Sequence, residues 1–213
     1  MNKLVNLVNK RMNMSVVRKV TSNASSEYTG VMFGGTLPDT MGKFHNPAGD
    51  ELLLVASIDG DKINETLSKE LFPKGRVFSI LSTYSDNDYF LDDISFFGGE
   101  DELNYIKSGF TKVIASNCDE FLLSNGIDAE VNSVDLPEDA FPAFSFISDN
   151  IPNGLIGFEK LLDEYYFVAQ FYSNDIPVKN GEAFYLSDAN GYLFIKRDIS
   201  NSSDAGLFFV QSA

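Results

Sequence analysis

The chain of 213 residues has no tryptophan, one cysteine, one histidine and few basic residues. Cys118 has no second cysteine with which to form an intramolecular disulfide, so nothing indicates an oxidising compartment. No stretch approaches the ~20 apolar residues that a membrane-spanning helix needs, and the first residues lack the apolar core of a signal peptide. These absences predict a soluble, cytoplasmic protein that has no membrane partner.

Basic residues are outnumbered, because 16 Lys and Arg stand against 31 Asp and Glu, for a net charge of −15. Residues 1–19 contain five of the bases and no acid, so the rest has 16 − 5 = 11 bases against 31 acids, or −20. Such a body repels nucleic acid and anionic membranes and attracts basic proteins. The alternative is that the excess of acids serves only to keep the protein soluble, since many cytosolic proteins are acidic.

The composition, 44% hydrophobic with 19 Phe and 9 Tyr, is that of a folded protein. Short apolar runs bounded by Asn, Asp and Gly are typical of buried strands, and the eight residues 165–172 are such a run, in which seven side chains are large or apolar. Further strands are expected at 51–59, 76–84, 192–195 and 206–211, and residues 31–38 are expected to be a strand that runs into a turn. The fold class predicted is mainly β (α+β), an antiparallel β-rich single domain with a few short helices.

The helices expected are few. Residues 1–20 place apolar side chains near helical spacing with Lys and Arg between them, which predicts a basic helix, and residues 21–26 form a polar linker. The β-rich domain then comprises residues 27–213. Residues 63–72 carry Ile63, Leu67 and Leu71 at a spacing of four, which predicts a second helix, with Asn64 on its solvent face.

Acidic and aromatic residues alternate over residues 85–102, where a solvated loop is expected. A calcium loop starting at Asp86 would need glycine at its sixth position and an acid at its twelfth, but these are Leu91 and Phe97. Aromatic side chains are enriched in interfaces, so the segment is predicted to bind a basic partner. The predicted partner-binding residues are Tyr84, Asp86, Asp88, Tyr89, Phe90, Asp92, Asp93, Glu100, Asp101 and Glu102, and Phe96 and Phe97 are further possible anchors.

Catalytic motifs do not stand out in the sequence. His45 has no second histidine for a metal site, and Cys118 has no basic neighbour that would lower its pKa. The glycines Gly34 and Gly35 are not followed by the residues of a phosphate-binding loop. We therefore expect no enzyme, no metal and no cofactor, although an enzyme or small-ligand binder with an unrecognised site stays open.

The two halves of the chain resemble each other, over residues 31–115 and 150–211. Val55-Ala56 aligns with Val168-Ala169 in the middle of a long apolar strand. Phe33-Gly34-Gly35 aligns with Ile156-Gly157-Phe158, and Gly75 with Gly191. The pattern predicts an internal duplication of a β unit whose two copies pack on each other.

These elements also resemble the YwqG-like family of bacterial proteins, the domain known as DUF1963. The resemblance rests on Phe33-Gly34-Gly35-Thr36-Leu37-Pro38, Leu54-Val55-Ala56-Ser57-Ile58-Asp59, Asn153-Gly154-Leu155-Ile156-Gly157-Phe158, Val168-Ala169-Gln170-Phe171-Tyr172, Gly191-Tyr192-Leu193-Phe194-Ile195 and Phe208-Phe209-Val210-Gln211. Ser57 stands where the family has Gln, and Asn153 where it has His, as in a divergent member. The resemblance implies a mainly antiparallel β fold with an internal duplication and no agreed chemistry.

Two kinds of function follow from the acidic surface. The first is a non-catalytic module that docks or neutralises a basic protein partner, such as a toxin or a nucleic-acid-binding protein, as immunity proteins do. The second is a nucleic-acid mimic, whose carboxylates occupy the basic groove of a DNA-binding or defence protein. Neither binds nucleic acid directly.

Overall fold

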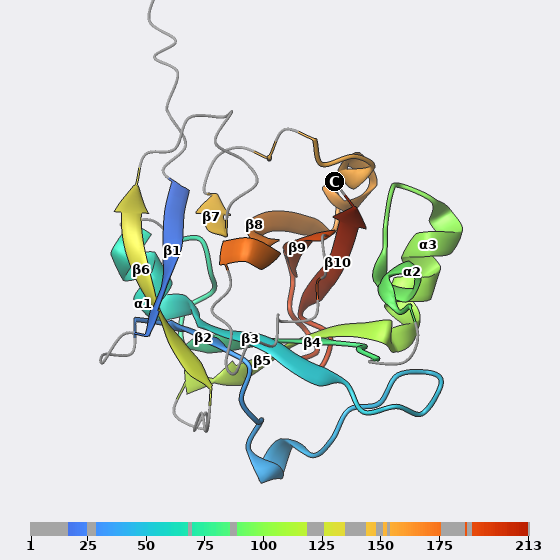
Figure 1. The fold of residues 1–213 in the computed structure, drawn as a ribbon, viewed down its shortest axis with the longest axis horizontal. Coiled ribbons are helices and arrows are strands. Elements are labelled where there is room, and N and C mark those ends of the chain that lie inside the picture. Colours follow the sequence, from blue (N-terminus) through green and yellow to red (C-terminus); the bar gives the residue numbers. More distant parts are fainter. Residues whose placement is uncertain are drawn as a thin grey trace, which may run out of the picture.

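In a computed structural model of the chain, ten antiparallel strands close into one barrel (Figure 1). The structure describes residues 17–24, 29–67, 70–85, 89–118, 126–134, 144–147, 151–152, 154–175, 186 and 189–212. The strands are β1 Val17–Ala24, β2 Val31–Phe33, β3 Leu53–Asp59, β4 Arg76–Ser82, β5 Thr111–Asn117, β6 Ile127–Val134, β7 Ser145–Ile147, β8 Tyr165–Tyr172, β9 Ala189–Lys196 and β10 Gly206–Ser212. Their order around the barrel is β1-β6-β2-β3-β4-β5-β10-β9-β8-β7. The mainly β, antiparallel fold predicted from the sequence is therefore confirmed.

Helices are short and lie in the connections between strands. They are α1 Gly60–Leu67, α2 Leu91–Ile94, α3 Glu100–Tyr105, a π-helix at Ile106–Phe110 and 3-10 turns at Asp39–Met41, Phe158–Leu161 and Ser173–Asp175. In the part of the chain that is described, no helix has the length and apolar character needed to cross a membrane.

The expected N-terminal helix and linker are wrong where the structure describes them. Residues 17–24 form strand β1, which pairs with both β6 and β7 and so belongs to the barrel. Val17 and Val20 are β-branched and favour a strand, and the partner strands supply the backbone hydrogen bonds that the local sequence pattern does not reveal. The rest of that prediction, residues 1–16 and 25–26, lies outside the described residues.

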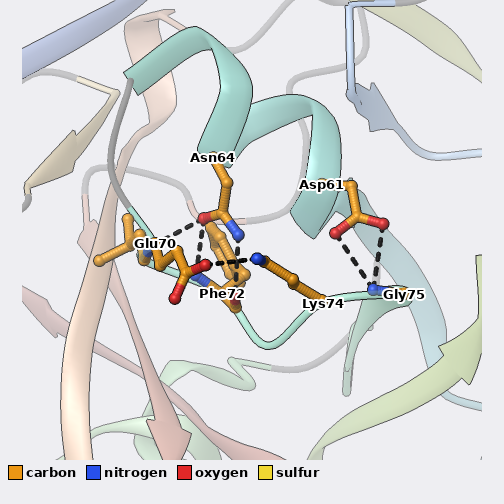
Figure 2. A network of polar contacts seen from close by, with 7 residues as sticks. Asp61, Asn64, Glu70, Phe72, Lys74 and Gly75 are labelled. Atoms are coloured by element: carbon orange, nitrogen blue, oxygen red, sulfur yellow. Dashed lines mark hydrogen bonds and ion pairs between the residues drawn. The ribbon is translucent and has the colours of Figure 1, made fainter.

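The second expected helix is shorter than the spacing of its apolar residues predicts. The structure has α1 at Gly60–Leu67, and Leu71 and Phe72 follow in a turn. Asn64 is half-buried instead of facing solvent: its Oδ1 accepts hydrogen bonds from the backbone N–H groups of Leu71 and Phe72, at 2.7 and 2.8 Å, and its Nδ2 donates to the Phe72 carbonyl at 2.7 Å. Figure 2 shows this network beside the Asp61 carboxylate, which accepts from the Gly75 N–H. The side chain of Asn64 thus stabilises the turn that leads into β4.

Matching β-bulges mark an internal duplication of four strands, β2–β5 and β7–β10. Val55 in β3 and Val168 in β8 are each an extra residue between two ladder pairs. The flanking pairs are Leu54 with Leu81 and Ala56 with Ile80 in the first unit, and Phe167 with Phe194 and Ala169 with Leu193 in the second. The alignment of Val55-Ala56 with Val168-Ala169 made from the sequence therefore agrees with the strand register.

The register corrects the other two alignments. Phe33 pairs with Ala56 and Phe146 pairs with Ala169, so the two copies share one offset, 146 − 33 = 113 and 169 − 56 = 113. Phe146 in β7, and not the segment at 156–158, is thus the counterpart of Phe33, and the second copy begins before residue 150. Gly191 corresponds to position 191 − 113 = 78, which is a phenylalanine and not Gly75. The glycines misled the alignment because Gly75 lies in the turn before β4, whereas Gly191 lies within β9 and pairs with Phe171.

Phenylalanine side chains fill the barrel. The interior cluster contains Phe33, Phe78, Phe144, Phe146, Phe171 and Phe208, each fully buried. Phe144 lies edge-to-face against Phe33 and Phe171, with ring centroids 5.1 and 4.8 Å apart. Because burial of one such side chain contributes about 1.5–3 kcal/mol, these rings dominate the stabilisation of the core.

The outer face of each unit has its own apolar cover. On the first unit, Leu54, Leu81 and Ile114 lie beneath the 37–44 loop. On the second unit, the outer face of the sheet carries the aromatic side chains of Phe167, Phe194 and Phe209. Phe96 packs on them, with its ring centroid 5.0 Å from that of Phe209. Phe96 therefore anchors the acidic segment on the outside of the second unit, while Phe90, Leu91 and Ile94 of the same segment belong to the interior cluster.

Candidate functional site

Residues 89–102 of the acidic segment are structured, and are not the solvated loop expected from their composition. Helix α2 and helix α3 lie beside β10, on the outer side of the barrel (Figure 1). Ser95 forms a parallel bridge with Val210 of β10, and the N–H of Phe96 donates to the Val210 carbonyl at 3.2 Å. The name acidic-aromatic surface is used below for residues 89–105 together with Ile156.

Gln211 ties this segment to the barrel. Its buried side chain donates from Nε2 to the carbonyls of Phe96 and Ile156, at 2.6 and 2.8 Å. Its Oε1 accepts from the Ile156 N–H at 3.3 Å. Two segments far apart in sequence are thereby joined at one end of β10.

Two glycines meet where the segments touch. Gly98 and Gly157 have positive φ, +98° and +74°, and a Cβ on Gly157 would lie 2.4 Å from the Gly98 Cα. No other residue type permits backbones to approach this closely. Lys160 completes the contact by donating from Nζ to the Gly98 carbonyl at 2.6 Å.

Within each of two adjacent aromatic pairs, one side chain is buried and one is exposed. Phe90 is buried with Tyr84 against it, ring centroids 5.2 Å apart, while Tyr89 is 71% exposed. Phe96 is buried, while Phe97 is 39% exposed. The expectation that Phe90 and Phe96 are partner anchors is therefore wrong, because both are buried in the protein's own core, whereas Tyr84 is half-buried against Phe90.

The acidic residues fall into two groups. Asp92, Glu100 and Asp101 are exposed. Glu102 is half-buried, and its carboxylate accepts from the N–H groups of Phe97 and Gly99, at 2.7 and 2.9 Å, which caps α3. Glu102 is thus structural, whereas the first three are available to a partner.

Asp93 and Tyr105 link α2 to the end of α3. The Tyr105 hydroxyl donates to Asp93 Oδ1 at 3.1 Å, and its ring stacks on Phe110 with centroids 4.4 Å apart. Desolvation, and then the hydrogen bond to Asp93, raise the pKa of the Tyr105 hydroxyl. Asp86 and Asp88, also predicted as partner-binding, lie outside the described residues.

Exposed apolar side chains concentrate on this one surface. Among the described residues, the large hydrophobic side chains that are exposed are Tyr89, Phe97, Tyr105 and Ile156. Three of them come from residues 89–105, which contain five acidic residues and no basic one. Phe97 is one of the possible anchors expected from the sequence, and its exposure agrees with that expectation. Ile156 was not expected, because it reaches this surface through the contact between Gly98 and Gly157 and its own neighbourhood gives no signal.

The residues considered for catalysis lie in different elements of the fold. His45 is exposed in the 42–51 loop, and Cys118 is half-buried at the end of β5. In the part of the chain that the structure describes, no three His, Cys, Asp or Glu side chains gather as a metal site. Burial raises the pKa of Asp128 in β6. This carboxyl lines neither the pocket under the 37–44 loop nor the pocket where β5 meets β10.

Comparison with protein-family models, with curated proteins and with solved structures finds no match for this chain. The resemblance to the YwqG-like family thus stays a prediction, and the candidate site rests on the geometry alone.

Proposed function

We propose that this protein is a non-catalytic module that docks onto a basic protein partner through the acidic-aromatic surface. The observation that carries the proposal is the coincidence of exposed apolar side chains with unopposed carboxylates on residues 89–105. Monomeric proteins seldom expose large apolar side chains together, and such groups with a charged rim are typical of interaction sites.

Each kind of residue has its own part in the proposed interface. Tyr89, Phe97 and Tyr105 present aromatic rings that a partner buries, which supplies most of the affinity. Asp92, Glu100 and Asp101 are exposed in the same segment and, with the net charge of −15, attract a cationic partner and speed its association. Neutralisation of a toxin is one role that such docking serves. The single Cys118 suits a reducing interior, so we propose a cytoplasmic location.

The test combines charge reversal with a matched control. A tagged chain is used to isolate a partner from cells of the source organism, and the affinity of the purified pair is then measured by surface plasmon resonance. Asp92→Lys with Asp101→Lys is compared with Glu65→Lys and Asp198→Lys, which alter charge equally at exposed positions elsewhere.

We expect the surface pair of substitutions to weaken binding by about a hundredfold and the control pair by less than about fivefold. Tyr89→Ala is expected to raise the dissociation rate by about tenfold with little effect on association. Equal losses for both charge pairs would contradict docking at this surface, and so would a partner that is itself acidic.

A further inference from the structure

A pocket of about 400 Å³ opens at the seam between the two duplicated units. There β5 meets β10: Gly206 pairs with Val113, and the Ala205 N–H donates to the Val113 carbonyl at 2.8 Å. The π-helix Ile106–Phe110 and the turn at 201–204 contribute the remaining walls. Junctions between structural units are places where small-molecule sites commonly form.

The lining of this pocket reverses the charge of the molecule. Lys107, Lys112 and Lys196 line it, together with the carboxylates of Glu164 and Asp204. Three ammonium groups against two carboxylates give 3 − 2 = +1, in a chain whose net charge is −15. A small anion therefore meets a locally favourable site in a molecule that is acidic as a whole.

Two of the three ammonium groups are already paired. Lys107 Nζ lies 3.7 Å from Glu164 and 5.6 Å from the centre of the Tyr165 ring, and Lys196 forms an ion pair with Asp204. These pairs place charge along one wall and shield Tyr165, whose pKa is raised by burial and then by Glu164 and Asp204. The wall is thus preorganised, with its cations held by their own carboxylates.

Lys112 is the cation left for a ligand. It is half-buried and, among the residues that the structure describes, has no carboxylate partner; its ammonium lies 5.7 Å from the centre of the Phe44 ring. A ring in this position holds the ammonium without neutralising it. Lys112 lines this pocket and Phe44 does not, so the side chain brings its unneutralised ammonium to a bound anion by turning away from the Phe44 ring.

We infer that this pocket binds a small organic oxyanion, with a carboxylate or phosphate group that contacts Lys112. A volume of about 400 Å³ is at the low end of the range for ligand pockets, which restricts the ligand to a small molecule. The inference does not depend on the proposed docking function, because the acids of the acidic-aromatic surface take no part in it.

Calorimetric titration of the full chain tests this inference, with ribose 5-phosphate, inorganic phosphate and succinate as anionic probes and ribose as the neutral probe. Saturable binding of at least one anionic probe, with no binding of ribose, is expected. Preference for the phosphates identifies a phosphate ester as the ligand class, and preference for succinate identifies an organic acid. Failure of all three anions to bind, or equal binding of ribose, overturns the inference.

Matched variants then locate the binding. Lys112→Gln is expected to weaken binding of the best probe about ten- to one-hundredfold, whereas Lys74→Gln, the same charge change at an exposed ion pair that does not line the pocket, leaves binding unchanged. Asp204→Asn removes a pocket carboxylate and is expected to strengthen anion binding several-fold, compared with no change for Glu70→Gln. Unfolding midpoints monitor folding of each variant. Equal effects of Lys112→Gln and Lys74→Gln overturn the assignment to this pocket.

Discussion

At the scale of single residues, Asn64 has a structural role that the sequence pattern around it does not predict. Asn64 belongs to an amphipathic pattern in which its position faces solvent, yet its side chain makes three hydrogen bonds to the backbone of Leu71 and Phe72. Periodicity along a helix shows which side chains share a face. It does not show that a later segment, here Leu71 and Phe72, folds back over that face and covers Asn64.

Replacing Asn64 tests this role. Asn64→Ala leaves two N–H groups and one carbonyl without their partner, so we expect a loss of about 2–3 kcal/mol in the free energy of unfolding. Asn64→Asp keeps the accepting oxygens but loses the donor, so an intermediate loss is expected. Urea unfolding measures both, and Asn104→Ala at an exposed position is the control. A value for Asn64→Ala as small as that of the control would contradict the role.

Adjacent aromatic pairs show the same limit. Tyr89-Phe90 and Phe96-Phe97 are alike in sequence, and in each pair one ring enters the core and one faces solvent. Composition alone predicts an aromatic, acidic segment, but it cannot assign which ring anchors the segment and which meets a partner.

The element that carries the candidate site owes its position to contacts outside itself. Helices α2 and α3 are 4 and 6 residues long, too short to be stable alone. Gln211 from β10 and the Gly98–Gly157 contact hold the segment between them against the barrel. The shape of the acidic-aromatic surface therefore depends on residues that do not belong to the acidic segment.

Gly157→Ala, with Gly154→Ala as its control, tests this dependence. Both glycines have positive φ, +74° and +96°, so both substitutions strain the backbone by about 1–2 kcal/mol. A Cβ at Gly154 meets nothing within 4 Å, whereas at Gly157 it meets the Gly98 backbone at 2.4 Å. We expect Gly157→Ala to lower the free energy of unfolding by about 1–3 kcal/mol more than Gly154→Ala, measured in urea.

The same pair of variants bears on the proposed interface. Gly157→Ala is expected to weaken partner binding because it displaces Phe97 and Ile156, whereas Gly154→Ala leaves binding nearly unchanged. Equal stability losses for the two glycine variants would show that the Gly98–Gly157 contact is not as tight as described.

At the scale of the whole molecule, net charge opposes folding and favours association. A charge of −15 on one barrel repels itself in the compact state, and the same field attracts a cationic partner. Salt screens both the self-repulsion and the attraction to a partner. Added salt is therefore expected to stabilise the fold and to slow association.

Raising NaCl from about 10 to about 100 mM shortens the Debye length from about 30 to about 10 Å. We expect the melting temperature, measured by circular dichroism, to rise by a few degrees, and the association rate with a basic partner to fall about tenfold. Choline chloride is the control for specific ion binding and is expected to act equally. A melting temperature that falls as salt is added would contradict self-repulsion as a term in stability.

The sequence by itself determined the class of fold and one of the three alignments between the duplicated units. Short aromatic and β-branched runs separated by turns require a β structure, and the match of Val55-Ala56 with Val168-Ala169 identified the duplicated bulge because a bulge is a local feature. It also predicted the acidic-aromatic segment, since charge and aromatic content are additive along the chain.

Tertiary structure decided the rest. Strand β1 joined the barrel through partners more than a hundred residues away, Phe146 became the true counterpart of Phe33, and Ile156 reached the candidate surface through two glycines. Each of these depends on pairing between distant segments, whose register is set by packing in three dimensions and leaves no periodic signal in the neighbourhood of the residue itself.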